Sequence, residues 1–228
     1  ATNISLELIN GWQANVSLEE CGEVEKNTFC LKAFNITIPN ATSPGNYYVN
    51  VSVTWRNPDS SISLNKTEVN VTVASNPLIN VSEEKVSGEA GDGISSFIGN
   101  FTVVSVGNDE LKNVSFSCYS GVVCRDFVVK FIPNNISSLA PGFNYSVAVN
   151  VSVPLGYATG TYTGEINVSA ENGNSKTLTI EVFVPINRTW SLFPEYCQRA
   201  ETPEHGIACE INVSNLGNTY INFTVSPE

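Results

Sequence analysis

The sequence contains the same β-hairpin pattern twice, and this repetition limits the possible folds more than any other feature. The clearer copy runs over residues 160–184, GTYTGEINVSAENGNSKTLTIEVFV, and the earlier copy over residues 45–73. Apolar or small residues alternate with polar ones in both arms, as in strands with one buried face. In the second copy, Asn and Gly between the arms favour a tight turn because they tolerate positive φ. The pattern predicts a repeated β-sandwich unit.

The two copies align without a gap. Pro39 precedes Tyr47 by eight residues, and Pro154 precedes Tyr162 by eight residues. In the second copy the period of two directs one set of side chains inward. These are Tyr162, Gly164, Ile166 and Val168 in the first arm, and Leu178, Ile180, Val182 and Val184 in the second arm.

Spacings near 100 residues predict the domain organisation. Cys21 and Cys118 are 97 residues apart, as are Asn3 and Asn100. This period and the all-β pattern suit tandem immunoglobulin-like β-sandwiches better than short solenoid repeats. We expect a short N-terminal sandwich at 1–76, a complete one at 77–185, and a partial third repeat at 186–228.

Charge and hydropathy exclude several classes of partner. Charged residues make up 14% of the chain and the formal net charge is −11, with no basic run. This argues against nucleic acid or an anionic membrane as partner. No apolar run reaches the roughly 20 residues of a membrane-spanning helix. We interpret the chain as a mature secreted product whose signal peptide has been removed.

Asparagine supplies the surface polarity that charge does not. The chain has 28 Asn and 42 Ser plus Thr, so chance predicts about 5 Asn-x-Ser/Thr sequons, whereas it contains 17. Alternating strands alone favour polar–apolar–polar triplets, but Thr, Lys, Gln or Glu would serve equally well in the first position. The excess predicts dense N-glycosylation. The acceptors are Asn3, Asn15, Asn35, Asn40, Asn50, Asn65, Asn70, Asn80, Asn100, Asn113, Asn135, Asn144, Asn150, Asn167, Asn187, Asn212 and Asn222.

Six cysteines in a secreted chain indicate disulfides. Fifteen connectivities exist, but spacing favours three local pairs, each within one loop of a repeat. Zinc ligation is the alternative; it is disfavoured because the chain has no Cys-x-x-Cys and one histidine, His205. The expected pairs are Cys21–Cys30, Cys118–Cys124 and Cys197–Cys209.

Two stretches resemble a known group of surface repeats. VSVGNDELKNVSFS (104–117) and VSNLGNTYINFTVS (213–226) are similar to a stretch of adhesion-type and NEW3-type immunoglobulin-like repeats. GTYTGEINVSA resembles the G-x-Y-x-G-x-I-x-V strand of the same repeats, which are abundant in archaeal surface proteins. With the sequon density, the whole looks similar to subunits of archaeal extracellular filaments, including the thin thread type built by strand donation. The resemblance implies a structural role and specifies no ligand.

Catalytic and metal-binding patterns are weak. A Ser or Cys nucleophile needs a base, and the one histidine, His205, lies in a loop that looks exposed. The carboxylate pairs Glu19/Glu20 and Glu83/Glu84 fall at strand ends, and we expect them to be solvated. Glu89 and Asp92, in a Gly-rich loop, could hold Ca²⁺, but they lack the regular Asp spacing of calcium loops. We therefore expect no enzyme activity and no cofactor beyond covalent glycans. Packing is the expected role of Trp12, Trp55 and Trp190, and a sugar-binding platform is the alternative.

Three functions remain open at this point. The chain is a subunit of an extracellular filament, a segment of a long surface or S-layer protein, or a carbohydrate-binding accessory module. In the first, copies join head to tail by strand exchange, with the cell surface or a neighbouring filament as further contacts. The short first unit is the expected acceptor. The expected donor residues are Trp190, Leu192, Phe193, Ile211, Val213, Ile221, Phe223 and Val225.

Overall fold

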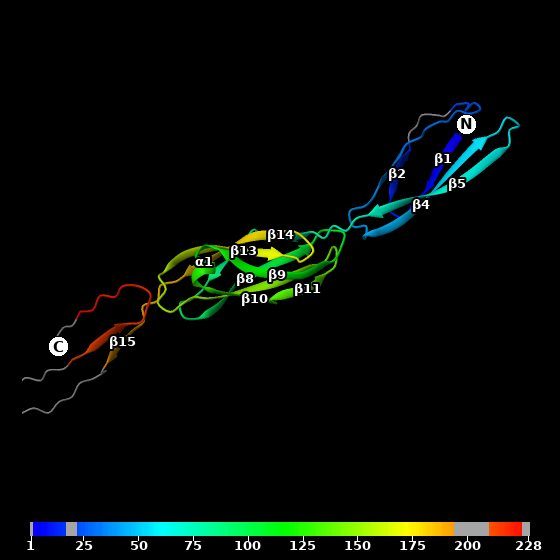
Figure 1. The fold of residues 1–228 in the computed structure, drawn as a ribbon. Coiled ribbons are helices and arrows are strands. Elements are labelled where there is room, and N and C mark those ends of the chain that lie inside the picture. The colour runs from blue at the N-terminus through cyan, green and yellow to red at the C-terminus, as the bar shows by residue number, and fades with distance from the viewer. Residues whose placement is uncertain (1, 17–21, 194–209, 225–228) are drawn as a thin grey trace, which may run out of the picture. The chain divides into compact units, whose positions relative to one another are not determined.

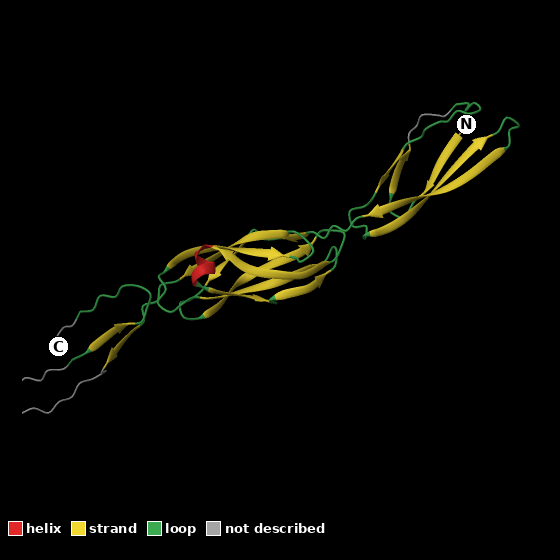
Figure 2. Cartoon of the chain, in the orientation of Figure 1, coloured by secondary structure: helices red, strands yellow, loops and turns green. Residues whose placement is uncertain are grey.

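The structure, a computed structural model, describes residues 2–16, 22–193 and 210–224 and is built almost entirely of strands (Figures 1 and 2). The predicted all-β sandwich class is confirmed. The chain separates into two compact units. Unit 1 comprises residues 1–78 with the loops 105–110 and 140–142, and unit 2 comprises the remainder. The division predicted at residues 76 and 185 stays a prediction. Among the described residues, no helix combines the length and apolar character that crossing a membrane requires.

Unit 2 contains a complete two-sheet sandwich. One sheet has the strand order β10-β12-β8-β6 and the other the order β11-β9-β13-β14-β7. One short helix, α1, follows β9. The bounds are β6 (Ile79–Val81), β7 (Lys85–Glu89), β8 (Ser95–Ser105), β9 (Leu111–Ser120), α1 (Gly121–Asp126), β10 (Val128–Ile132), β11 (Asn135–Leu139), β12 (Asn144–Ser152), β13 (Gly160–Ser169) and β14 (Ser175–Val184). A separate hairpin, β15 (Trp190–Phe193) with β16 (Asn212–Asn215), ends the unit.

The core of this sandwich is the layer of side chains between the two sheets. Strands β8 and β12 contribute alternate, fully buried residues, and β13 and β14 face them with another alternating set. Phe101 lies at the centre, with edge-on ring contacts to Phe116 at 5.6 Å and Phe131 at 6.3 Å. All eight inward positions predicted in the second hairpin face this layer: seven are buried and Tyr162 is half-buried.

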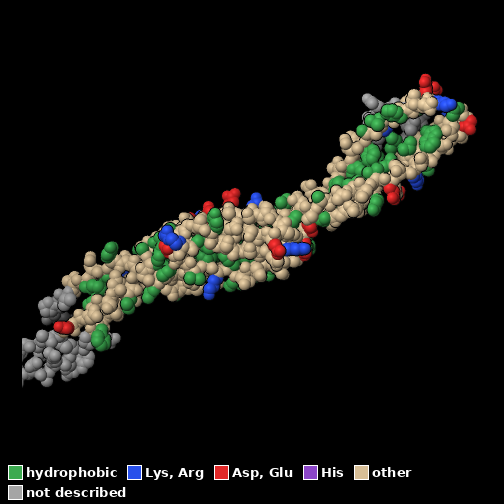
Figure 3. All heavy atoms as spheres, viewed as in Figure 1, with side chains coloured by type: hydrophobic (Ala, Val, Ile, Leu, Met, Phe, Trp, Pro, Cys, Tyr) green, Lys and Arg blue, Asp and Glu red, His purple; other side chains and the backbone are tan. Residues whose placement is uncertain are grey.

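Unit 1 contains two smaller sheets. One has the order β1-β4-β5 and the other pairs β2 with β3. Among the side chains described in these strands and their loops, three apolar ones are buried: Trp12, Val49 and Val51. Figure 3 shows hydrophobic side chains lying open on the visible face of this unit. The bounds are β1 (Thr2–Glu7), β2 (Gln13–Val16), β3 (Phe34–Thr37), β4 (Gly45–Arg56) and β5 (Ile62–Val73).

The repeated hairpin is confirmed in register and in detail. Gly45 pairs with Val73 in the first copy, and Gly160 pairs with Val184 in the second. Both glycines have φ of 153°, which an L side chain rarely adopts. Two residues later, Tyr47 and Tyr162 each donate a hydrogen bond to the carbonyl oxygen four residues back, at 2.7 and 2.9 Å. The two hairpins are therefore structural equivalents.

Some elements differ from the sequence-based expectation. Gly88 and Glu89 were expected in a loop, but they end β7, which pairs in parallel with β14. Gly88 fits there because a Cβ would approach the Ile98 carbonyl oxygen to 2.6 Å. The short elements β11 and α1 carry no strong periodicity and were not expected. Strands β1 and β2 are consecutive in the sequence but do not pair with each other, because β1 pairs with β4 and β2 with β3.

We expect Phe101→Ala to lower the free energy of unfolding by about 3–5 kcal/mol, because it opens a cavity in a closed core. Phe97→Ala is the matched control, since Phe97 lies on the same strand but is 61% exposed. It should change stability by no more than about 0.5 kcal/mol. Guanidinium unfolding of the full chain measures both, and equal losses would contradict this assignment of the core.

Candidate functional site: glycan acceptors and open strand edges

The sequon asparagines lie at the surface. The side chains of sixteen of the seventeen are described, and none of these is buried; the side chain of Asn3 lies outside the described set. Four are half-buried: Asn50, Asn150, Asn167 and Asn187. The exposed acceptors are Asn15, Asn35, Asn40, Asn65, Asn70, Asn80, Asn100, Asn113, Asn135, Asn144, Asn212 and Asn222.

The alternation of strands explains this placement. Where a sequon lies on a strand of the sandwich, its middle residue usually enters the core and its two polar residues face outward. Phe101, Val114, Val151 and Val168 are all fully buried in this way. Acceptors occur on both sheets of the unit 2 sandwich, with Asn100 and Asn150 on one and Asn113 and Asn167 on the other. Neither outer face of the sandwich lacks acceptors.

Asn187 differs from the other acceptors because its side-chain amide is engaged at both ends. Its Nδ2 donates to Asp92 Oδ1 at 3.0 Å, and its Oδ1 accepts from the Thr189 hydroxyl at 2.5 Å. Asn113 also donates through Nδ2, to Glu171, but both of these side chains are exposed. A glycan would displace a surface contact at Asn113 and a half-buried network at Asn187.

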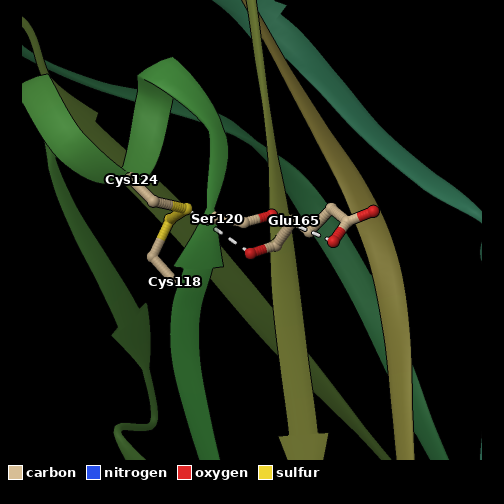
Figure 4. Close-up of a disulfide and its surroundings, with 4 residues drawn as sticks. All are labelled: Cys118, Ser120, Cys124 and Glu165. Carbon is tan, nitrogen blue, oxygen red and sulfur yellow. Dashed lines mark hydrogen bonds between the residues drawn. A yellow bond between two sulfur atoms is a disulfide. The ribbon is translucent and has the colours of Figure 1, made fainter.

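One predicted disulfide has both of its cysteines among the described residues. Cys118 and Cys124 are bonded and link the end of β9 to α1 (Figure 4). Beside this disulfide, Ser120 donates to Glu165 at 2.9 Å, which ties the same segment to β13. Cys30 is also disulfide-bonded. Its predicted partner Cys21 and the predicted pair Cys197–Cys209 lie outside the described residues, so those pairings stay predictions.

A polar cluster at α1 supports this end of the sandwich. Arg125 donates to both carboxylate oxygens of Asp126, at 2.8 and 3.1 Å, and Tyr157 donates to Asp126 at 2.7 Å. The Arg125 and Tyr157 hydrogen bonds lower the pKa of Asp126 to about 2. The hydrogen bond to Asp126, with desolvation, raises the pKa of Tyr157 to about 12. The ring of Tyr157 also packs edge-on against Phe127 at 4.8 Å.

The two residues considered as calcium ligands, Glu89 and Asp92, have different surroundings. Asp92 accepts from Asn187 through Oδ1 and from the Gly156 backbone N–H through Oδ2 at 3.1 Å. Glu89 lies at the end of β7, where its backbone pairs with Phe183. Among the described residues, no group of three or more His, Cys, Asp or Glu is arranged to hold a metal ion.

The other residues singled out have structural surroundings or are not described. Glu83 accepts from the Thr102 backbone N–H at 2.6 Å and joins β8 to the loop before β7. Trp12 packs on Tyr47 with ring centres 5.2 Å apart, and Trp55 donates to Asn57 at 3.0 Å. His205 and the pair Glu19/Glu20 lie outside the described residues.

Strand β5 of unit 1 has an edge that its counterpart in unit 2 does not have. Its counterpart β14 lies between β13 and β7, whereas β5 pairs with β4 alone among the described strands. Ile62 and Leu64, near the start of β5, are exposed. Unpaired backbone groups and exposed apolar side chains together favour the addition of another strand.

The predicted donor residues occupy the last hairpin and the segment after it. Trp190, Leu192 and Phe193 belong to β15, and Val213 belongs to β16. The ring centres of Trp190 and Phe223 lie 5.9 Å apart, yet both side chains remain largely exposed, as does Ile211. Ile221 is half-buried, and Val225 lies outside the described residues.

A hydrogen-bonded Asn latch occurs twice, once before β6 and once before β15. Asn108 accepts from the Asn76 backbone N–H at 2.8 Å and donates through Nδ2 to the Ala74 carbonyl at 3.0 Å. Asn218 does the same with Asn187 and Pro185, at 2.7 and 2.8 Å. The preceding residues, Gly107 and Gly217, have no room for a Cβ beside the Asn76 and Asn187 carbonyl oxygens.

Comparison with known proteins gives low similarity throughout. No protein-family model and no curated protein matches the chain. Protocadherin gamma B2 extracellular cadherin domains 1–5 match 94% of this chain and 39% of that one, at 9% identity and a TM-score of 0.45. Protocadherin gamma B7 domains EC3–6 match 86% and 44%, at 11% identity and 0.45. A family 123 glycoside hydrolase from Clostridium perfringens matches 48% and 27%, at 13% identity and 0.37. The chain spans less than half the length of each of these three.

The sequence analysis missed the cluster of Arg125, Asp126 and Tyr157 and the Asn latch. The cluster joins Asp126 to Tyr157, 31 positions later in the sequence, and no local sequence pattern specifies such a contact. The latch had a signal in the repeated Gly-Asn pair at 107–108 and 217–218. Its partners could not be identified, because the chain segments that it binds lie about thirty residues earlier.

Because its pKa is lowered on folding, Asp126 stabilises the fold above its unfolded pKa of about 4, and this contribution is lost as the pH falls towards about 2. We therefore expect Asp126→Asn to lower the melting temperature at pH 6 and to reduce the drop between pH 5 and pH 2. Thermal unfolding followed by circular dichroism measures this difference. Glu165→Gln is the control, because it also removes a carboxylate close to the Cys118–Cys124 disulfide. Parallel pH profiles for the wild type and Asp126→Asn would contradict the assignment.

Proposed function

We propose that the chain is a heavily N-glycosylated structural subunit of an extracellular filament, in which copies join head to tail by strand complementation. One observation carries the proposal. Within the described residues, a complete sandwich is flanked in the sequence by two smaller parts, an N-terminal unit with little core and a C-terminal hairpin with exposed aromatic residues. An incomplete sandwich leaves apolar surface and backbone groups in water, and an added strand removes both costs.

Such assembly gives an open filament. The acceptor surface lies in unit 1 and the donor lies after Pro185, so the contact is heterologous and need not close into a ring. The resemblance of 104–117 and 213–226 to archaeal surface repeats is consistent with this role and suggests an archaeal source. Disulfides and dense sequons support an extracellular location.

The second candidate is a segment of a long surface protein made of tandem repeats. The Asn latch favours it, because the same hydrogen bonds precede β6 and β15. In such a protein each incomplete sandwich is completed by neighbouring residues of the same polypeptide. The carbohydrate-binding module lacks a comparable observation, since Trp12 and Trp55 have packing or hydrogen-bonding roles within unit 1 and Trp190 lies in unit 2.

A protein ending at Pro185 tests the donor role. We expect it to remain monomeric, because it keeps the sandwich of β6 to β14 and loses the donor hairpin. Electron microscopy and light scattering of the full-length and shortened proteins give the result, and thermal unfolding verifies that the shortened protein is folded. Unchanged fibres from the shortened protein would reject the donor role.

Glycopeptide mapping of the native protein tests the modification. We expect glycans at Asn50, Asn70, Asn100, Asn113, Asn150, Asn167 and Asn212, because their side chains reach the surface. Asn187 should be the least occupied of the mapped sites, because Asp92 and Thr189 hold its amide. A native protein without glycans, or with a single one, would contradict dense glycosylation.

A further inference from the structure

The strands of unit 1 correspond one by one to part of the unit 2 sandwich. The equivalent hairpins β4–β5 and β13–β14 fix the alignment. Strand β1 then lies beside β4 where β9 lies beside β13. The pair β2–β3 matches β10–β12, because Gln13 pairs with Thr37 as Val128 pairs with Ser152. Thr37 and Ser152 both stand two residues before a proline. Among the described strands of unit 1, none corresponds to β6, β7, β8 or β11.

The C-terminal hairpin supplies the counterparts of β6 and β8. The backbone N–H of Val106 donates to the Leu78 carbonyl at the start of β6, and that of Leu216 donates to the Thr189 carbonyl at the start of β15, both at 2.9 Å. The Asn latch follows in both cases, because Asn108 lies two residues after Val106 and Asn218 lies two residues after Leu216. Strand β15 therefore corresponds to β6 and β16 to β8. The stretch between them, where a counterpart of β7 would fall, lies outside the described residues.

One sheet is thus divided between the two incomplete parts. In unit 2 this sheet has the order β10-β12-β8-β6. Unit 1 holds the equivalents of β10 and β12, and the C-terminal hairpin holds the equivalents of β8 and β6. Joined edge to edge, they give the order β2-β3-β16-β15, with no strand of this sheet duplicated and none missing.

The exposed side chains match this division. Ile79 and Phe101 are 1% and 0% exposed in the complete sandwich, whereas Trp190 and Ile211 at the equivalent positions are 52% and 53% exposed. In the half of the sheet that unit 1 holds, Phe34 and Ile36 of β3 are only half-buried, whereas the equivalent residues Val149 and Val151 of β12 are fully buried. Each part exposes the apolar residues that the other part would cover.

We propose that residues 210–214 of one molecule, which lead into and form most of β16, pair in antiparallel fashion with residues 29–33 of a second copy, just before β3, so that the strands follow one another in the order β2-β3-β16-β15. The occupant is a second copy because this chain carries both complementary halves of the sheet. The inference rests on the proposed head-to-tail assembly and adds its register. In unit 2, Ala148 of β12 pairs with Asn100 of β8. The equivalent pair across the junction is Ala33 of one molecule and Glu210 of the next, both exposed at present.

Intermolecular disulfide formation tests this register with the full chain. Three proteins are made, Ala33→Cys, Glu210→Cys and Ser191→Cys, each with its native cysteines. Mixing the first two under mild oxidation should give a reducible dimer, because paired residues of neighbouring strands lie within disulfide reach. Ser191→Cys is the control. Its residue lies on β15, two strand spacings or about 10 Å from β3 across the sheet, and should give at least about tenfold less dimer with Ala33→Cys.

Peptide mapping and electron microscopy separate the outcomes. A link between positions 33 and 210 of different molecules, with Cys118–Cys124 intact, is the expected result. Filaments that form without this link, or that link position 33 preferentially to 191, would overturn the register and leave head-to-tail assembly standing. Absence of any polymer would overturn the proposed function itself. A protein with both Ala33→Cys and Glu210→Cys that links within one monomer at high dilution would exclude the second copy as partner.

Discussion

A β-sheet with one apolar face is stable only when another layer covers that face, and this constraint governs the whole chain. In the unit 2 sandwich the condition is met, because Phe101 and the alternating residues of β8 and β12 face those of β13 and β14. In unit 1 the same hairpin is present, but fewer described strands surround it, and among the described side chains Trp12, Val49 and Val51 are the apolar ones buried there. Equivalent sequences therefore reach different degrees of burial because they have different neighbours.

The junctions before β6 and β15 show how a weakly charged chain uses asparagine within its fold. One side-chain amide offers both a donor and an acceptor, so Asn108 and Asn218 each bind two backbone groups of another segment. Gly at the preceding position lets the backbones approach closely, since a Cβ would overlap a carbonyl oxygen. The side-chain amide of Asn187 also bridges two segments, but it donates to the Asp92 carboxylate rather than to the backbone. The same residue type therefore serves as a structural clamp and as a candidate glycan acceptor, and neither Asn108 nor Asn218 lies in an Asn-x-Ser/Thr sequon.

The distribution of sequons links the fold to its proposed environment. A strand places every second side chain outward, so an Asn-x-Ser triplet with an apolar centre can occupy either sheet without a loss of core volume. Acceptors on both faces of the sandwich would cover the surface with glycans, while the strand edges at β3 and β5 stay available for pairing. Glycans on the faces of a sheet and strand addition at its edges would be compatible, because side chains leave a sheet at right angles to the direction in which strands pair.

The sequence by itself determined the local features of this protein. Period-two alternation identified both hairpins and the eight inward positions of the second one, because alternation depends on backbone geometry alone. Spacing identified Cys118–Cys124, since a loop of this length closes locally. Only the tertiary structure decided which strands are neighbours. It showed that β7 pairs in parallel with β14, that Asp126 meets Tyr157, and that Asn108 and Asn218 clamp segments about thirty residues away. These contacts join residues distant in sequence, and no local pattern specifies them, because pairing depends on which strand edges remain free after the sheets have formed.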